Sequence, residues 1–146
     1  AQLTETLGAV LVTFDRATNR GGVAAQTGNC DVLLQRVTVD LLGEGPACWW
    51  VNDFQFQALM GASPTILESD LILLHSFVVV NREENSFAAS GVVSLEAPPT
   101  GAPQPTAVLS APMEVGACDV LTLDASASSG GGGRALQYSY GVEAAE

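Results

Sequence analysis

Few side chains in this 146-residue chain are of the types that carry out chemistry, and their spacing forms no catalytic pattern. His75 is the only histidine, and it lies inside the apolar run Leu71–Val80, where a histidine that serves the fold is the simpler interpretation. A nucleophile–base pair needs partners at fixed places around such a residue, and the spacing offers none. The glycine run Gly130–Gly133 lacks the Lys-Ser/Thr that follows a phosphate-binding loop. The sequence therefore predicts a protein that is not an enzyme.

Carboxylates are the next group with a chemical use, because Ca²⁺ is bound by oxygen ligands. Asp15 with Asp31, or Asp119 with Asp124, offer such oxygens. No D-x-[DN]-x-[DN]-G loop organises them into a known cation site. We therefore expect no resident cofactor, with calcium at these four aspartates as the alternative.

Two adjacent tryptophans, Trp49 and Trp50, are the main candidates for contact with a ligand. Neighbouring residues of a strand face opposite sides, so one ring is expected in the core and the other exposed or covered by a neighbour. An exposed indole favours contact with a sugar or a protein, whereas packing near Cys30 and Cys48 is the commoner use of a tryptophan. Both interpretations stay open on the sequence alone.

The three cysteines leave one without a partner in the chain. Cys30 and Cys48 flank a hairpin-sized stretch, and a bridge between them would add roughly 3 kcal/mol by restricting the unfolded chain. Cys118 is then the unpaired cysteine. The alternative is three reduced core cysteines. We expect the bridge, because the absence of lysine and a proline-rich spacer suit a secreted repeat protein.

The charge balance excludes several classes of partner. The net charge is −11, with five arginines and no lysine, whereas nucleic acid and anionic membranes are bound by clustered cationic side chains. No apolar run approaches the ~20 residues that span a bilayer. The start at Ala1, without a basic segment and an apolar run, favours a mature or excised piece. We expect an extracellular or cell-surface location, with proteins as partners and glycans as the alternative.

The elements that must position these residues alternate in the manner of strands, separated by Gly, Pro and Asn turns. Val32–Leu42 suits either a strand or a short helix, and we predict a strand because Val37–Leu41 alternates more cleanly than it repeats at 3.6. This spacing predicts an all-β fold, a β-sandwich. The expected strands are Leu3–Leu7, Ala9–Phe14, Val32–Leu42, Cys48–Phe56, Ile66–Leu67, Asp70–Val80 and Phe87–Leu95.

A proline-rich stretch at 97–106 divides the chain and is expected to act as a short, semi-rigid polyproline II spacer. Residues 1–96 are predicted to form one complete module. Residues 107–146 are predicted to begin a second, with about three strands, too few to fold unaided. Asp119–Leu123 and Leu136–Val142 alternate as strands, and the Ser/Gly turn Ser128–Gly133 connects them.

The order of residues from Pro112 onward resembles a known kind of module. Leu123-Asp124-Ala125-Ser126, then the Ser/Gly turn, then Tyr138-Ser139-Tyr140 resembles the strand-turn-strand core of PKD and receptor-for-egg-jelly (REJ) modules. These are immunoglobulin-like domains of polycystins and of large surface proteins of algae and other protists. Tyr140 stands where the family usually has Trp, and Pro112–Cys118 supplies the Gly-x-Cys of the REJ-type versions. The segment TFDRATNRGG, ending at Gly22, more weakly resembles the opening of bacterial-Ig-like modules.

The resemblance implies a fold and a setting, without a substrate. It implies an immunoglobulin-like β-sandwich over 1–96 and a partial PKD/REJ-type module over 107–146, in which Cys118 pairs beyond Glu146. It also implies tandem modules in a structural, adhesive protein of a cell surface, including the surface of a cilium or flagellum. The alternatives are a carbohydrate- or calcium-dependent binding module, and a filament subunit completed by a strand from a neighbouring chain.

Overall fold

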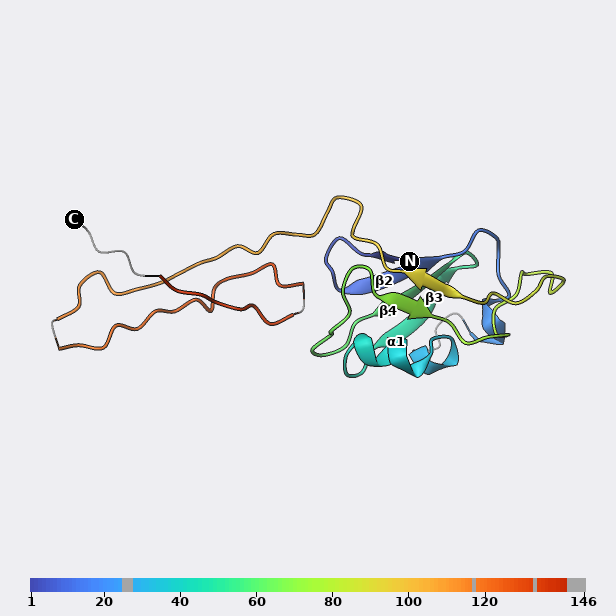
Figure 1. The fold of residues 1–146 in the computed structure, drawn as a ribbon, viewed down its shortest axis with the longest axis horizontal. Coiled ribbons are helices and arrows are strands. Elements are labelled where there is room, and N and C mark those ends of the chain that lie inside the picture. Colours follow the sequence, from blue (N-terminus) through green and yellow to red (C-terminus); the bar gives the residue numbers. More distant parts are fainter. Residues whose placement is uncertain (25–27, 117, 133, 142–146) are drawn as a thin grey trace.

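The computed structural model of the chain describes residues 1–24, 28–116, 118–132 and 134–141. Figure 1 shows a compact β-rich part and an extended part, orange to red, that projects from it. The buried hydrophobic cluster draws all its members from between Leu3 and Leu95. After Pro98, no described residue is buried. No helix among the described residues has the length and apolarity that crossing a bilayer requires.

The main sheet has four antiparallel strands in the order β1–β2–β4–β3. Val10 and Val12 of β2 point into the core, as do Trp50 of β3 and Phe56 of β4, because alternate residues of a strand share a face. The apolar, β-branched sequence of β2 suits this half-buried position. The bounds are β1 Gln2–Leu3, β2 Ala9–Thr13, β3 Ala47–Asn52 and β4 Gln55–Leu59.

The prediction of one strand over Cys48–Phe56 is wrong, because the chain reverses there and forms the β3–β4 hairpin. The Asn52 side-chain oxygen accepts the N–H of Phe54 at 2.8 Å, which stabilises a tight turn. A register irregularity between Trp50 and Asn52 precedes it. The polar pair Asn52-Asp53 is typical of a turn, but the alternating aromatic residues on both sides of it led to the prediction of one continuous strand.

The predicted strand at Val32–Leu42 is also wrong. The chain forms a short 3₁₀ helix, η2 (Cys30–Val32), and then α1 (Arg36–Leu41). α1 buries Thr38 and Val39 and leaves Val37 63% exposed, as a helix facing the core does. Arg36 and Asp40 form an ion pair one turn apart at 2.8 Å, an arrangement only a helix provides.

The second sheet pairs β5 (Leu71–Leu73) with β6 (Val92–Ser94) in antiparallel fashion. The long strands predicted at Asp70–Val80 and Phe87–Leu95 reduce to these short segments, and Ile66–Leu67 is not a strand. Positive φ angles at Phe77 (66°) and Gly91 (120°) interrupt the extended backbone on both sides of the loop. Likewise Leu7, with φ 58°, ends the pairing expected over Leu3–Leu7.

Isolated backbone pairs join further parts of the compact fold. Gln2 of β1 pairs in parallel with Glu96, which follows β6, and Leu34, between η2 and α1, pairs with Leu74 beside β5. The fold is therefore mainly β with little helix, and residues of both sheets and of the helical segment contribute to one buried cluster.

The extended part has no named strand among its described residues, although strands were expected at Asp119–Leu123 and Leu136–Val142. Two isolated backbone pairs, Thr106 with Ser129 and Ser110 with Asp124, hold the stretches 106–110 and 124–129 side by side. No sheet face lies beside these two stretches to bury their apolar side chains, and a hairpin without such a face is only marginally stable. Gly133 and Val142, which belong to the expected turn and strand, lie outside the described residues.

The glycine turn of the extended part lies against the compact part. Gly132 has a positive φ of 59°, and a Cβ on it would lie 2.7 Å from the Leu7 side chain. The Arg134 guanidinium donates a hydrogen bond to the carbonyl of Ile66. Glycine is thus needed here both for the backbone conformation and for the close approach.

Candidate functional site

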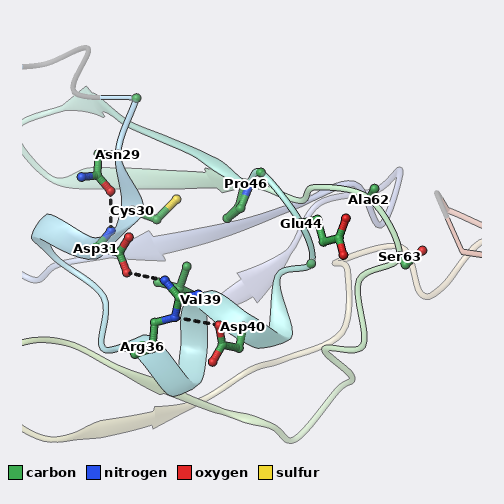
Figure 2. Close-up of a pocket in the computed structure, with 13 residues that line it drawn as sticks. Asn29, Cys30, Asp31, Arg36, Val39, Asp40, Glu44, Pro46, Ala62 and Ser63 are labelled. Carbon is green, nitrogen blue, oxygen red and sulfur yellow. Dashed lines mark hydrogen bonds and ion pairs between the residues drawn. The ribbon is translucent and has the colours of Figure 1, made fainter.

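A wide hollow of the compact part lies beside the disulfide, between η2, α1 and the loops before β3 and after β4 (Figure 2). Its volume is about 810 Å³. The polar side chains on its wall are those of Asn29, Asp31, Arg36, Asp40, Glu44 and Ser63.

The one arginine on this wall is paired with two of its three carboxylates. Figure 2 shows the Arg36 guanidinium between two carboxylates, with Asp40 at 2.8 Å from Nε and Asp31 at 3.6 Å from the terminal nitrogen. Both acids and the arginine are well exposed, so water screens the pairs and each contributes at most about 1 kcal/mol. Asp31 also donates its N–H to Asn29 at 2.9 Å, which caps η2. The side chains described on this wall form ion pairs and a helix cap, and they do not combine a nucleophile with a base.

The disulfide joins Cys30 of η2 to Cys48 of β3, with 5.0 Å between the Cα atoms and 18 positions between the residues in sequence. This is the pair that the spacing favours. Both cysteines are buried, at 2% and 0% exposure. Gly28 donates its N–H to the carbonyl of Cys48 at 2.9 Å, so the chain before η2 also pairs with β3. The bridge fastens the helical segment to the sheet, while Cys118 is free and exposed.

The structure places the two tryptophans on opposite faces of β3. Trp50 is 4% exposed and packs between Phe14 and Phe56, with ring centroids 5.5 and 5.4 Å away. Among the residues that the structure describes, none accepts a hydrogen bond from its indole N–H. Trp49 lies on the outer face, partly exposed, level with Gln57 of β4. Trp50 is therefore a core residue, and Trp49 is the one available to a ligand.

The four aspartates considered for calcium lie in separate places. Asp15 borders a hollow beside Phe87, and Asp31 is paired with Arg36 as described. Asp119 accepts the N–H of Gly116 at 3.0 Å. Across the described ranges, no three His, Cys, Asp or Glu side chains lie close enough to share a metal ion.

Asp124 is held in a turn of the extended part. It accepts the backbone N–H of Ser126 at 2.9 Å. That bond, followed by one from the Ser126 hydroxyl, lowers the pKa of the Asp124 carboxyl below its usual 3.8. The carboxylate thus supports local backbone structure.

Sequence reasoning missed the ion-pair cluster centred on Asp53, in the β3–β4 turn. Its carboxylate contacts the guanidinium of Arg20 at 2.7 Å and that of Arg82 at 3.1 Å. It ties the hairpin to two loops that are far away in sequence. No local pattern relates these three residues, because only the fold brings them together.

Comparison of the chain with models of protein families, with curated proteins and with solved structures gives no match. The resemblance to PKD/REJ and bacterial-Ig-like modules therefore depends on the residues quoted for it, and the function has to be argued from the geometry.

Proposed function

We propose that this chain is a structural, adhesive module of a large extracellular protein and that it works through protein–protein contacts. The observation that carries the proposal is the extended part. None of its described apolar side chains is buried, whereas the compact part, which also exposes several, has a buried core. The most exposed are Val108, Leu109, Met113, Val120, Leu121, Tyr138 and Tyr140.

A segment of this length cannot bury these side chains on its own. Among its described residues, two isolated backbone pairs and a few side-chain hydrogen bonds are the main internal contacts. Many exposed apolar side chains on one segment are typical of protein interaction sites. The partner supplies the missing surface. The semi-rigid proline spacer at 97–106 leads into the segment, which projects from the compact part and touches it at the Gly132 turn (Figure 1).

The setting that we propose is extracellular. A buried disulfide is suited to an oxidising compartment, and a net charge of −11 keeps neighbouring molecules from clumping non-specifically. We further propose that the compact part is an immunoglobulin-like sandwich and that the extended part begins a PKD/REJ-type module. The residues of the strand-turn-strand pattern support this assignment.

Adhesion between coated beads tests the proposal. Beads carrying the wild-type chain are expected to cluster, and a Leu109→Ser/Tyr138→Ser/Tyr140→Ser variant should cluster much less. A Phe77→Ser/Phe87→Ser variant is the control, because these rings are 88% and 101% exposed on the compact part. Wild-type beads that stay dispersed at every coating density would contradict the proposal, and clustering abolished by a calcium chelator would favour the calcium-dependent alternative.

The outer face of the main sheet favours a second candidate, binding of a neutral sugar. Trp49 lies in a row with Gln57 and Leu11, and no outward-facing residue of β2, β3 or β4 is charged. An indole ring beside an amide offers an apolar platform and hydrogen bonds to a ring with hydroxyl groups. Glycan-array binding that Trp49→Ala abolishes and Phe87→Ala preserves would establish this function, and an array without binding would remove it.

A further inference from the structure

Two neighbouring contacts hold the glycine turn of the extended part against the compact part. The Arg134 guanidinium donates a hydrogen bond to the carbonyl of Ile66, 68 positions earlier in the sequence, and its Nε atom is buried. Gly132 lies so close to Leu7 that a Cβ on the glycine would be 2.7 Å from the Leu7 Cβ. We call these two contacts, Arg134 with Ile66 and Gly132 with Leu7, the turn seat.

The compact part contributes firmly held residues to the turn seat. Leu7 is 8% exposed and donates its N–H to the carbonyl of Thr4 at 2.9 Å, which closes the turn between β1 and β2. Ile66 is 0% exposed and donates its N–H to the carbonyl of Leu41, the last residue of α1, at 3.0 Å. Close-packed residues of this kind move little and transmit strain. The seat is therefore a fixed point of the core.

The extended part contributes a turn that is tied to its own first stretch. Ser129 and Thr106 exchange two backbone hydrogen bonds, at 2.9 and 3.0 Å. Gly130 has a positive φ of 93°, and a Cβ on it would lie 2.9 Å from the carbonyl oxygen of Gln104. The turn thus packs against the end of the proline-rich spacer and the stretch that follows it. A contact that fixes the turn fixes this stretch as well.

The proline-rich spacer does not fix the direction of the extended part by itself. It contains a turn in which Gly101, with a positive φ of 86°, donates its N–H to the carbonyl of Pro98 at 2.9 Å. Beside this turn, the exposed Thr100 hydroxyl donates a hydrogen bond to the Glu5 carboxylate. A chain changes direction easily at a glycine, and water competes for an exposed hydrogen bond. The spacer therefore acts as one pivot near the compact part.

We propose that the turn seat sets the direction in which the extended part projects, so that the two parts move as one body (Figure 1). One pivot leaves the extended part free to rotate, and a second contact, far along the chain from the first, removes this rotation. Gly132 and Arg134 are then positioning residues. The inference rests on the proposed function, because a segment that is already held in one direction loses less conformational freedom when it meets its partner.

A distance measurement by pulsed electron paramagnetic resonance tests the proposal in the full-length chain. One spin label is attached to the native Cys118, and the other to Phe87→Cys, where the native ring is 101% exposed on the compact part. Cys30 and Cys48 take no label, because they are joined in the buried disulfide. The distance distribution is expected to be a single narrow peak. Gly132→Ala/Arg134→Ala should broaden it about twofold or more, because the spacer then pivots.

A Gly45→Ala/Arg16→Ala variant is the matched control. Gly45 has a similar φ of 69°, and a Cβ there meets nothing within 4 Å. Arg16 is exposed and forms no ion pair with a described residue. The control therefore introduces the same backbone strain and removes the same charge away from the seat, and its peak should stay as narrow as that of the wild type. A wild-type distribution as broad as that of Gly132→Ala/Arg134→Ala would overturn the proposal.

Nuclear Overhauser effects in the wild-type chain provide a measurement that needs no variant. The close approach of Gly132 to Leu7 predicts a strong effect between the Hα protons of the glycine and the side-chain protons of the leucine. Its absence would overturn the proposal. Clustering beads combined with a broad distance distribution would overturn the seat and leave the adhesive function standing. Dispersed wild-type beads combined with a narrow distribution would contradict the adhesive function and support the seat.

Discussion

Loss of the Cys30–Cys48 disulfide is expected to remove a large part of the stability of the compact part. The bridge closes a loop of 18 positions, for which chain entropy predicts a contribution of about 3 kcal/mol. Domains of this kind unfold with only about 5–15 kcal/mol. With an m-value of about 1–3 kcal/mol/M in urea, the midpoint for Cys30→Ala/Cys48→Ala should fall by about 1–3 M. Alanine is the suitable replacement, because both sites are buried and a serine hydroxyl would need a partner.

The fluorescence of Trp50 reports this unfolding, because its ring is buried between Phe14 and Phe56. Cys118→Ser is the matched control, and its midpoint should equal that of the wild type because Cys118 is exposed and free. Reduction of the wild-type chain should reproduce the double-alanine result. A loss below about 1 kcal/mol in both the reduced chain and the variant would refute the assignment of a stabilising bridge.

Three further perturbations probe other contacts. Thr38→Val should lower the free energy of unfolding in urea by about 1–3 kcal/mol. The buried Thr38 hydroxyl accepts the N–H of Leu73 at 3.0 Å, and valine would leave that N–H unpaired. An unchanged urea midpoint would contradict this prediction. Asp53→Asn should cost about 1 kcal/mol at low salt and less at high salt, since its partners Arg20 and Arg82 are 36% and 67% exposed and are reached by water and ions. A loss of stability that does not depend on salt would exclude an ionic origin. NMR titration should place the pKa of Asp124 in the folded chain below 3.8. The carboxylate stabilises the turn fully above the pKa that Asp124 has in the unfolded chain, and this stabilisation is lost as pH falls through the lower pKa of the folded chain. A pKa at or above 3.8 would show that the hydrogen bond from Ser126 is absent.

The sequence indicates β structure most reliably where hydrophobic alternation and burial coincide. Ala9–Phe14 was predicted as a strand, and β2 covers Ala9–Thr13, with Val10 and Val12 buried. The same alternation implied that Trp49 and Trp50 face opposite sides. Alternation failed at Arg36–Leu41, because five or six residues satisfy a strand and a helix pattern equally well and the packing around Thr38 decides.

The candidate sites depend on contacts that no local pattern encodes. The Asp53 cluster joins residues about 30 positions apart in sequence, and only the fold brings them together. Contacts between distant segments are a property of the whole fold, so this cluster could not be predicted from the sequence.

Sedimentation velocity of the full chain carrying Cys118→Ser, over a wide range of concentrations, tests the central claim most directly. We expect species larger than the monomer that grow as concentration rises, because contact with another copy covers the exposed apolar side chains of the extended part. The Leu109→Ser/Tyr138→Ser/Tyr140→Ser variant should reduce this growth. A single 15.0 kDa species at every concentration would contradict the proposed adhesive function.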